Sequence, residues 1–350
     1  MIEVALRSLG TATPERYVTQ REAWEFLNKC YRLSEQEKEL YGRVLLEGPI
    51  RGRYLAVREL GELVCESADG QVGRFNREGV RIAVGAARKA MAGAGMGASD
   101  IGGIVVNTCT GYLCPGLSSY IAEELGLGEH THTLDIAGMG CGGAIPNLKA
   151  CCGFAGMGDG AVLSVAVEIC SATFFRGEED DLIISNCIFG DGASAAVLEA
   201  RDGKCHRPVF VDFESTILAR YREQLRYTRS EGRLKNVLSR KVPVIGARAV
   251  AQTVDRLLKR NDLERGDIDH WVVHPGGTTV LERVGAELGL ERERLCNSYK
   301  VLENYGNMSS PSVMFVLEEL LASGAVEEGQ KGVMVSFGAG FSAFAGLVRF

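Results

Sequence analysis

A cysteine flanked by glycines is the residue of this chain best suited to nucleophilic chemistry. Cys141 stands in the run AGMGCGGAIPNLKA, residues 137–150, between a strand-like stretch, 131–136, and a helix that is expected to begin at about Gly143. Glycines allow the sharp turn that leaves a thiol uncrowded. A helix N-terminus stabilises the thiolate that thioester exchange requires. Taken alone, however, such a cysteine is more typical of a buried structural residue in a packing turn.

A histidine and an asparagine later in the chain could complete such a site. His274 follows the apolar run WVV and precedes Pro-Gly-Gly, which predicts a position at the loop end of a buried strand, where α/β proteins carry functional groups. His274 alone is equally consistent with a structural role. Asn307 lies in the run NYGNMSSPS, residues 304–312. Its amide could donate to a developing oxyanion, although a Gly-Asn pair is usually turn chemistry.

A glycine-rich loop near the end of the chain is the fourth motif. In VSFGAGFS, residues 335–342, Gly338 and Gly340 could let backbone N–H groups reach a thioester oxygen. The loop lacks the G-x-G-x-x-G spacing and the following helix of a dinucleotide site. The chain also has no P-loop, kinase or H-E-x-x-H pattern. The order Cys, His, Asn on one α/β chain is more specific than any of these motifs alone.

The elements that must position these residues occur twice. Residues 79–107 and 246–274 both read as a helical run, a turn with an Asp-Ile pair and a β-branched strand. Residues 189–198 and 337–346 are a second similar pair, in the same order. Two similar α/β halves packed together predict an internally duplicated, five-layered α-β-α-β-α fold with a central helix layer. The alternative is two unrelated α/β domains whose similarity is generic.

The boundary between the halves is expected in the short polar stretch 201–206. This gives an N-terminal half, 1–203, with the nucleophile, and a C-terminal half, 204–350, with the histidine and the asparagine. Residues 15–78 are rich in helix formers and are predicted to cap the first half. Residues 212–242 are predicted to be an irregular, charged lid or pocket-forming insertion.

Composition excludes several classes of function. With 46% hydrophobic and 24% charged residues, the 350-residue chain is typical of a globular protein with a large core. The net charge of −6 argues against nucleic acid as a partner. The first ten residues lack a signal-peptide pattern, and no apolar run is long enough to span a membrane. The eleven cysteines show no metal-ligand spacing, so we expect reduced thiols in a cytoplasmic protein and no metal.

Together the motifs resemble the type III polyketide synthases. This chalcone and stilbene synthase-like branch belongs to the thiolase superfamily and is related to ketoacyl synthase III. The runs EICSATF (168–174), HPGG (274–277) and YGNMSS (305–310) favour this branch. FGDGA (189–193) is shared by both branches, and the closing GLVRF is more similar to ketoacyl synthase III. The similarity extends from about Thr11 to the end of the chain.

The resemblance implies an acyltransferase that performs decarboxylative Claisen condensation. Cys141 matches the nucleophile that carries the growing chain. His274 and Asn307 match the pair that binds the thioester carbonyl of malonyl-CoA. The implied substrates are an acyl-CoA starter and malonyl-CoA, with no bound cofactor, and the implied assembly is a homodimer.

The resemblance also implies a set of substrate-binding positions. Phe189 matches a gatekeeper between the coenzyme A tunnel and the cavity, and Cys114 matches a residue that reaches into the partner subunit. Arg51 and Arg53 lie in the region that meets coenzyme A phosphates. The remaining implied substrate-binding residues are Cys109, Thr110, Cys170, Thr173, Ser309, Gly338 and Gly340.

Departures from the plant pattern affect the expected product. Asn236 stands where the family has a second gatekeeper Phe, Ala339 replaces a Pro, and Gly142-Gly143 follows the nucleophile in place of Phe-Ala. These changes argue against a plant-like chalcone or stilbene product and fit an aliphatic or small aromatic starter.

Three alternatives stay open at this point. The first is a ketoacyl synthase III-like single condensation that uses malonyl-acyl carrier protein. The second is acyl transfer or non-decarboxylative condensation, which generally needs an extra active-site Glu. The third is an inactive partner subunit, which the presence of all three catalytic residues disfavours.

Overall fold

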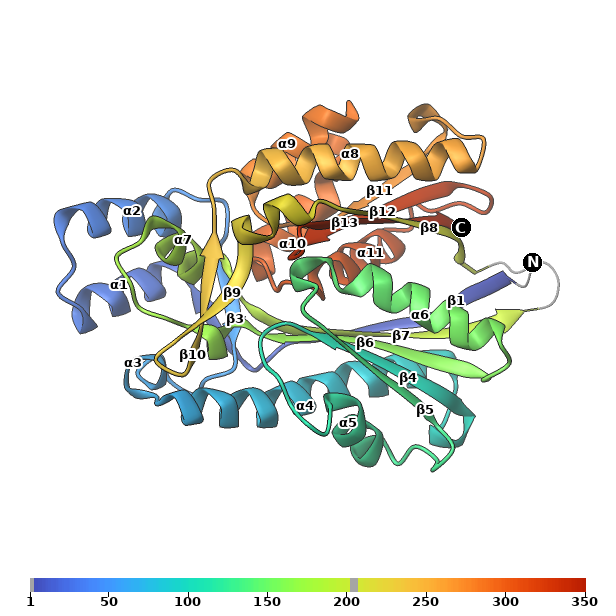
Figure 1. Cartoon of the computed structure of the whole chain (residues 1–350), viewed down its shortest axis with the longest axis horizontal. Helices are drawn as coiled ribbons and strands as arrows, with labels where there is room; N and C mark the ends of the chain where they lie inside the picture. The colour runs from blue at the N-terminus through green and yellow to red at the C-terminus, as the bar shows by residue number, and fades with distance from the viewer. Residues whose placement is uncertain (1–2, 202–206) are drawn as a thin grey trace.

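Two similar α/β halves are stacked on one another (Figure 1). The computed structural model describes residues 3–201 and 207–350, so the predicted boundary between residues 203 and 204 lies outside the described residues. In each half a long helix, a 3-10 turn and a strand follow one another, which confirms the predicted repeat. These elements are α4 (Ala68–Ala94), η1 (Ala98–Asp100) and β4 (Ile101–Thr108), and α8 (Val242–Arg260), η5 (Arg265–Asp267) and β11 (His270–Val273).

Nine strands form one continuous mixed sheet in the order β11-β12-β13-β8-β1-β7-β6-β4-β5. Its two half-sheets meet where β1 pairs with β8 through Val4–Phe210 and Ala5–Val209. Besides β4 and β11, the sheet contains β1 (Glu3–Ala12), β5 (His132–Ala137), β6 (Ala161–Ile169), β7 (Asp191–Arg201), β8 (Val209–Ile217), β12 (Lys331–Gly338) and β13 (Ser342–Arg349).

Helices separate and cover the half-sheets, which confirms the predicted five layers. Figure 1 shows α8 and α9 on one outer face, α6, α10 and α11 between the half-sheets, and α4 and α5 on the other outer face. Besides α4 and α8, these layers contain α5 (Leu117–Leu125), α6 (Ala144–Gly156), α9 (Thr278–Leu288), α10 (Cys296–Tyr305) and α11 (Ser312–Ala322). No helix among residues 3–201 and 207–350 is long and apolar enough to cross a bilayer.

The apolar patterns follow from these layers. Every residue of β6 is buried, as expected for a strand covered on both faces. The central helix α11 buries Val313 to Leu317 without interruption, because it packs between two sheets. The outer helix α8 instead buries one face and exposes charged residues on the other. Position in the stack therefore decides how much of each element is apolar.

A helical cap lies at one end of the layers, as predicted for residues 15–78. It contains α1 (Gln20–Cys30), α2 (Glu35–Leu46), α3 (Glu62–Cys65), β2 (Arg16–Thr19) and β3 (Gly52–Leu55), and α7 (Asp180–Ile188) packs against it. Ser34 and Glu37 form a capping box that starts α2.

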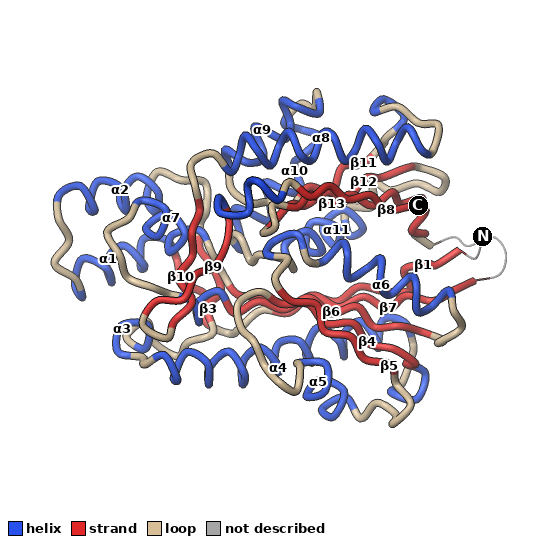
Figure 2. Tube along the Cα trace, in the orientation of Figure 1, coloured by secondary structure: helices blue, strands red, loops and turns tan. Residues whose placement is uncertain are grey.

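The segment 212–242 is more regular than predicted. Its first residues belong to β8 in the main sheet. After a 3-10 turn, η4 (Ala219–Gln224), the chain forms a hairpin of β9 (Leu225–Ser230) and β10 (Arg233–Leu238). Figure 2 shows this hairpin standing between the cap helices and the layered body. Every residue of β10 pairs with a residue of β9, which explains why this charged stretch is ordered.

We predict that the contact of α8 with β12 tolerates no side chain at Gly246. A Cβ added there would lie 2.5 Å from Cζ of Phe337. Overpacking should make Gly246→Ala destabilising by about 1–3 kcal/mol, seen as a lower melting temperature. Gly153→Ala in α6 is the control, because nothing lies within 4 Å of the added Cβ. Relief of glycine's entropic cost should stabilise that variant by roughly 0.5–1 kcal/mol. Equal melting temperatures for the two variants would contradict this packing.

Candidate active site

The turn that carries Cys141 connects β5 to α6. It consists of a 3-10 segment, η2 (Gly140–Gly142), and α6 then begins at Ala144, close to the predicted start. Gly140 has a φ of +56°, a conformation that favours glycine. A Cβ on Gly338 would lie 2.1 Å from the carbonyl oxygen of Met139. The glycine-rich loop therefore packs directly against the nucleophile turn.

Gly338 and Gly340 lie in the loop that packs against this turn. Neither glycine lines a described cavity, whereas Ala339 between them does. Gly338 acts by allowing the close backbone approach behind Cys141, and Gly340 by taking a φ of +128°. These observations assign both glycines a part in shaping the turn.

His274 lies at the end of β11, where its backbone N–H donates to the carbonyl of Val335 at 2.9 Å. The side chain is buried, and neither ring nitrogen has a hydrogen-bond partner among the described residues. Buried polar atoms without partners are rare and call for a ligand, a water or a catalytic role. The ring faces a cavity, so a bound molecule could provide the missing partner.

Asn307 is held in one orientation by its neighbours. Its Oδ1 accepts from the backbone N–H of Ser309 at 2.8 Å, and its Nδ2 donates to the carbonyl of Gly276 at 3.2 Å. Ser309 has a φ of +57°, unusual for a residue with a side chain. Since an amide nitrogen has two hydrogens, one N–H of Asn307 is left to donate into the cavity.

One cavity of about 450 Å³ is lined by Cys141, His274 and Asn307 together. We call it the entrance cavity. The first residue comes from one half of the chain and the other two from the second half. Its outer walls come from the end of α2, the start of α7, the segment after β10 and the loop before α9, and they include Asp180 and Arg240, which form an ion pair.

A second cavity of about 250 Å³ lies on the other side of Cys141, and we call it the reaction cavity. Cys141, Phe189 and Leu225 line both cavities, so Phe189 stands at their junction, as its predicted gatekeeper role requires. Cys109 and Ser309 also line the reaction cavity, as predicted. Tyr227 and Asn236 come from the hairpin, which confirms that segment 212–242 forms part of the pocket.

Glu168 is a residue of the site that sequence reasoning missed. It lies next to the end of the buried strand β6, is the one acidic residue of that strand, and is fully buried. Its carboxylate accepts six hydrogen bonds at 2.7 to 3.4 Å, from two backbone N–H groups and four hydroxyls. The donors belong to Thr108, Cys109, Thr110, Ser309 and Ser310. Burial raises the pKa of Glu168, and these bonds lower it. A lone acid in an otherwise apolar strand was the available signal.

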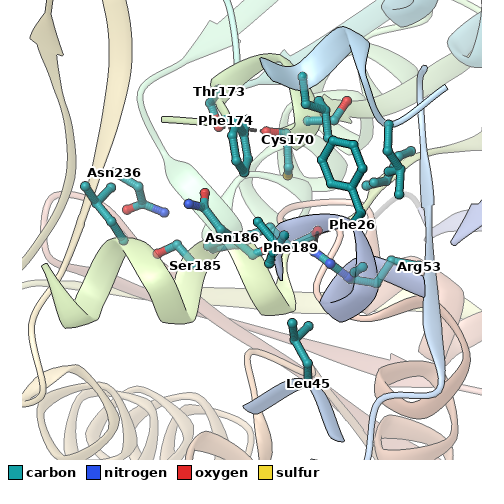
Figure 3. A pocket seen from close by; sticks show the side chains of 17 residues that line it. Phe26, Leu45, Arg53, Cys170, Thr173, Phe174, Ser185, Asn186, Phe189 and Asn236 are labelled. Carbon is teal, nitrogen blue, oxygen red and sulfur yellow. Dashed lines mark hydrogen bonds between the residues drawn. The ribbon is translucent and has the colours of Figure 1, made fainter. Parts of the chain in front are cut away.

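Four of the predicted substrate-binding residues do not line the reaction cavity. The hydroxyl of Thr110 donates to Glu168 at 2.9 Å and does not line the reaction cavity. Cys170 and Thr173 line a separate chamber beneath the cap (Figure 3). Cys114 is exposed and lines none of these cavities within its own chain.

Neither Arg53 nor Arg51 lines the entrance cavity. The guanidinium of Arg53 is buried and donates to the carbonyls of Phe189 at 2.6 Å and Asn186 at 2.8 Å. These bonds hold the backbone of Phe189 in place. Arg51 is exposed and pairs with Glu303 at 2.6 Å, outside the entrance cavity. The resemblance places Arg53 in the region that meets coenzyme A phosphates, whereas in the structure its guanidinium donates to buried backbone carbonyls.

Burial controls the charge states of the catalytic candidates. It raises the pKa of Cys141 to about 11, and hydrogen bonds from Ser309 and Asn307 only partly oppose it. Burial also lowers the pKa of His274 to about 3. Cys141 precedes α6, and desolvation outweighs any stabilisation of its thiolate by the helix N-terminus. Each group alone stays neutral near pH 7.

Comparison with known proteins agrees with this arrangement. The family models for the N-terminal and C-terminal domains of chalcone and stilbene synthases match residues 3–202 and 214–349. The chain is 33% identical to a 3,5-dihydroxyphenylacetyl-CoA synthase of Streptomyces toyocaensis, over 82% of this chain and 75% of that protein. It is 32% identical to the bisdemethoxycurcumin synthase of Oryza sativa subsp. japonica, over 99% and 92%.

A solved structure shows the same fold over the full length. The PKS-I of the brown alga Ectocarpus siliculosus superposes with a TM-score of 0.93 at 28% identity, covering 100% of this chain and 98% of that one. The two matched domains, the relatives and this superposition agree with one another. The chain belongs to the chalcone and stilbene synthase family and is a type III polyketide synthase, an acyltransferase that condenses malonyl-CoA.

Proposed function

We propose that this synthase extends an acyl-CoA starter while the growing chain is bound to Cys141, with His274 and Asn307 as its catalytic partners. The observation that supports this most strongly is the shared entrance cavity. This one space is lined by a thiol, by an imidazole whose two nitrogens have no hydrogen-bond partner, and by an amide held in one orientation. No ketoacyl synthase III-like alternative is favoured by the relatives.

Priming requires the thiol to lose its proton. A lone thiolate is disfavoured by burial, so the proton passes to a ring nitrogen of His274, and the pair keeps zero net charge. The thiolate attacks the thioester carbonyl of the starter, a Cys141–acyl bond forms, and the carbon–sulfur bond to coenzyme A breaks. The thiolate of coenzyme A takes up the proton from His274.

Extension requires donors for a forming oxyanion. With malonyl-CoA in the entrance cavity, a ring N–H of His274 and the free N–H of Asn307 donate to its thioester oxygen. They stabilise the enolate that forms when the carbon–carbon bond to the carboxylate breaks and CO2 leaves. Neutral donors suit this step, because in a water-excluded site their dipoles count for more than in water. The enolate carbon then attacks the acyl carbonyl on Cys141, a carbon–carbon bond forms, and the carbon–sulfur bond to Cys141 breaks, which releases the thiolate of Cys141 to take back its proton.

We also propose the division into halves at residues 203 and 204 and a reduced, cytoplasmic setting. The two family models, which end at residue 202 and begin at residue 214, support the division. Nine cysteines whose side chains the structure describes are free thiols, which supports the setting.

Activity with malonyl-CoA and a panel of starter acyl-CoAs, without carrier protein, tests the proposal. We expect CO2 release and products of more than one extension by mass spectrometry. Cys141→Ala should abolish the products. Asn307→Ala should slow CO2 release by about 10²–10³-fold, because one oxyanion donor is lost, while starter still acylates Cys141. Activity only after carrier protein is added would indicate single condensation, and no activity in either case would contradict the proposal.

We propose a homodimer that forms through β5. This strand is the edge of the nine-stranded sheet, and most of its residues are exposed, including the apolar Leu134. Tyr112, in the loop after β4, is 72% exposed. An unpaired edge with apolar neighbours is a template for another strand. Pairing of two β5 strands would bring exposed Cys114 of each chain to the partner, which supports its predicted role.

Light scattering tests this assembly. We expect about twice the chain mass of 37.7 kDa. Leu134→Glu should shift the mass toward that of one chain, because two like charges would face each other across the new pairing. Ile217→Glu is the control, since Ile217 is also apolar and is more exposed than Leu134, 71% against 37%, but lies on β8. A single-chain mass for the wild type, or equal masses for the two variants, would contradict the proposed interface.

A further inference from the structure

Two buried asparagines, Asn107 and Asn147, take no part in the mechanism above. Asn107 lies near the end of β4 and Asn147 in the first turn of α6, and both side chains are buried. The two elements are otherwise mainly apolar. An amide is costly to bury unless its hydrogen bonds are made, so the partners of these two amides indicate what the pair holds together.

Asn147 connects the helix that follows the nucleophile to two strands of the sheet. Its two Nδ2 hydrogens are shared among the carbonyls of Val105 on β4 at 3.1 Å and Val165 on β6 at 2.9 Å and Oδ1 of Asn107 at 2.9 Å. Its Oδ1 accepts from the hydroxyl of Ser164 at 2.7 Å. Backbone carbonyls only accept hydrogen bonds, so they fix which end of the Asn147 amide faces Asn107.

This orientation is passed on to the loop of Asn307. Because Oδ1 of Asn107 accepts from Asn147, its Nδ2 points the other way and donates to the hydroxyl of Ser310 at 2.8 Å. The hydroxyl of Ser310 in turn donates to Oε1 of Glu168 at 2.7 Å. Three hydrogen bonds therefore run in one direction, from Asn147 to a buried carboxylate, and aligned bonds of this kind strengthen one another. We call them the amide chain.

The amide chain also touches the nucleophile turn. A Cβ added at Gly143 would lie 2.7 Å from Nδ2 of Asn107. Gly143 is the residue before α6 and stands two positions after Cys141. Asn107 therefore contacts the turn of Cys141 on one side and Ser310, three residues after Asn307, on the other.

We infer that Asn107 and Asn147 are positioning residues for condensation, which hold the turn of Cys141 and the loop of Asn307 at the spacing that the enolate needs to reach the acyl-cysteine. This inference rests on the proposed function. In that mechanism, starter acylation uses Cys141 and His274, whereas CO2 release and condensation use Asn307 as well. Loss of the amide chain should therefore slow the later steps far more than acylation.

The most informative variant is Asn107→Asp, which replaces the donating nitrogen by an oxygen. As a carboxylate, this group cannot donate to Ser310, and it places a second negative charge near Glu168. In its protonated form it carries an O–H that can donate as Nδ2 does. Burial and the neighbouring carboxylate both raise the pKa of an acid at this position. The donor should therefore return as the pH falls through that raised pKa.

The other titratable groups near this position do not produce the same pH dependence. On the elements packed against Asn107 they are one carboxyl and three thiols: Glu168, Cys109, Cys141 and Cys151. Asp135 of the neighbouring strand β5 accepts from the backbone N–H of Ser118 at 3.1 Å, on the face of the sheet that α5 covers. All five groups are present in the wild type too. A limb of the pH profile found only in Asn107→Asp thus belongs to the new acid.

The test measures two rates on the full-length enzyme as a function of pH: acylation of Cys141 by a starter acyl-CoA and CO2 release from malonyl-CoA. Asn107→Ala should lower the ratio of CO2 release to acylation by about 10–10²-fold at every pH, because small misplacements of reacting groups are costly. Asn107→Asp should show the same loss near pH 7 and recover as the pH falls. Ser164→Ala is the matched control, since it removes a buried bond to Asn147 but leaves the amide chain intact.

The outcomes separate this inference from the proposed function. A lowered ratio with recovery at low pH in Asn107→Asp alone supports the inference, and it is decisive even if Asn107→Ala does not fold. A wild-type ratio in folded Asn107→Asp, a loss that does not recover at low pH, or an equal loss in Ser164→Ala would overturn it. Neither acylation nor CO2 release in the wild type would overturn the proposed function instead.

Discussion

The carboxylate of Glu168 is the interaction on which the geometry of the site depends. It lies at the end of a fully buried strand and can remain there only because its oxygens are saturated with hydrogen bonds. Its donors are the 108–110 segment of the first half and Ser309 and Ser310 of the second. Both loops carry residues that line the reaction cavity. A single buried charge thus sets the position of one half's loop against the other's, and with it the position of Asn307.

The exclusion of water from the active site determines how Cys141 and His274 can react. Burial disfavours charge on Cys141 and on His274 separately, as their shifted pKa values show. A proton that moves between the two creates opposite charges at once, which a dry site tolerates better than one unpaired charge. The same dryness strengthens the donors that face a forming enolate. Nucleophile activation and oxyanion stabilisation are therefore two consequences of one enclosed cavity.

Much of the fold and of the nucleophile turn could be predicted from the sequence, because short motifs encode local turns and periodic patterns encode layers. The Gly-Cys-Gly turn, the helix start near residue 143 and the duplicated halves were all predictable. Side-chain direction was not. Thr110 follows Cys109 directly, yet its hydroxyl turns to Glu168, and Arg53 turns inward to carbonyls. Nor could sequence reveal that Cys170 and Thr173 line a separate chamber, because that depends on how the cap packs. Glu168 was visible only as an acid in an apolar strand.

The central claim is that Cys141 reacts because His274 takes its proton inside a dry pocket. The most direct test is the rate at which iodoacetamide alkylates Cys141 as a function of pH, followed by peptide mapping, in the wild type and in His274→Ala. We expect the variant to react much more slowly near pH 7. Its rate should then climb with pH toward about 11, since the thiol must ionise alone in its buried position. A variant that keeps the wild-type rate and pH profile would show that His274 does not activate the cysteine, and would contradict the account.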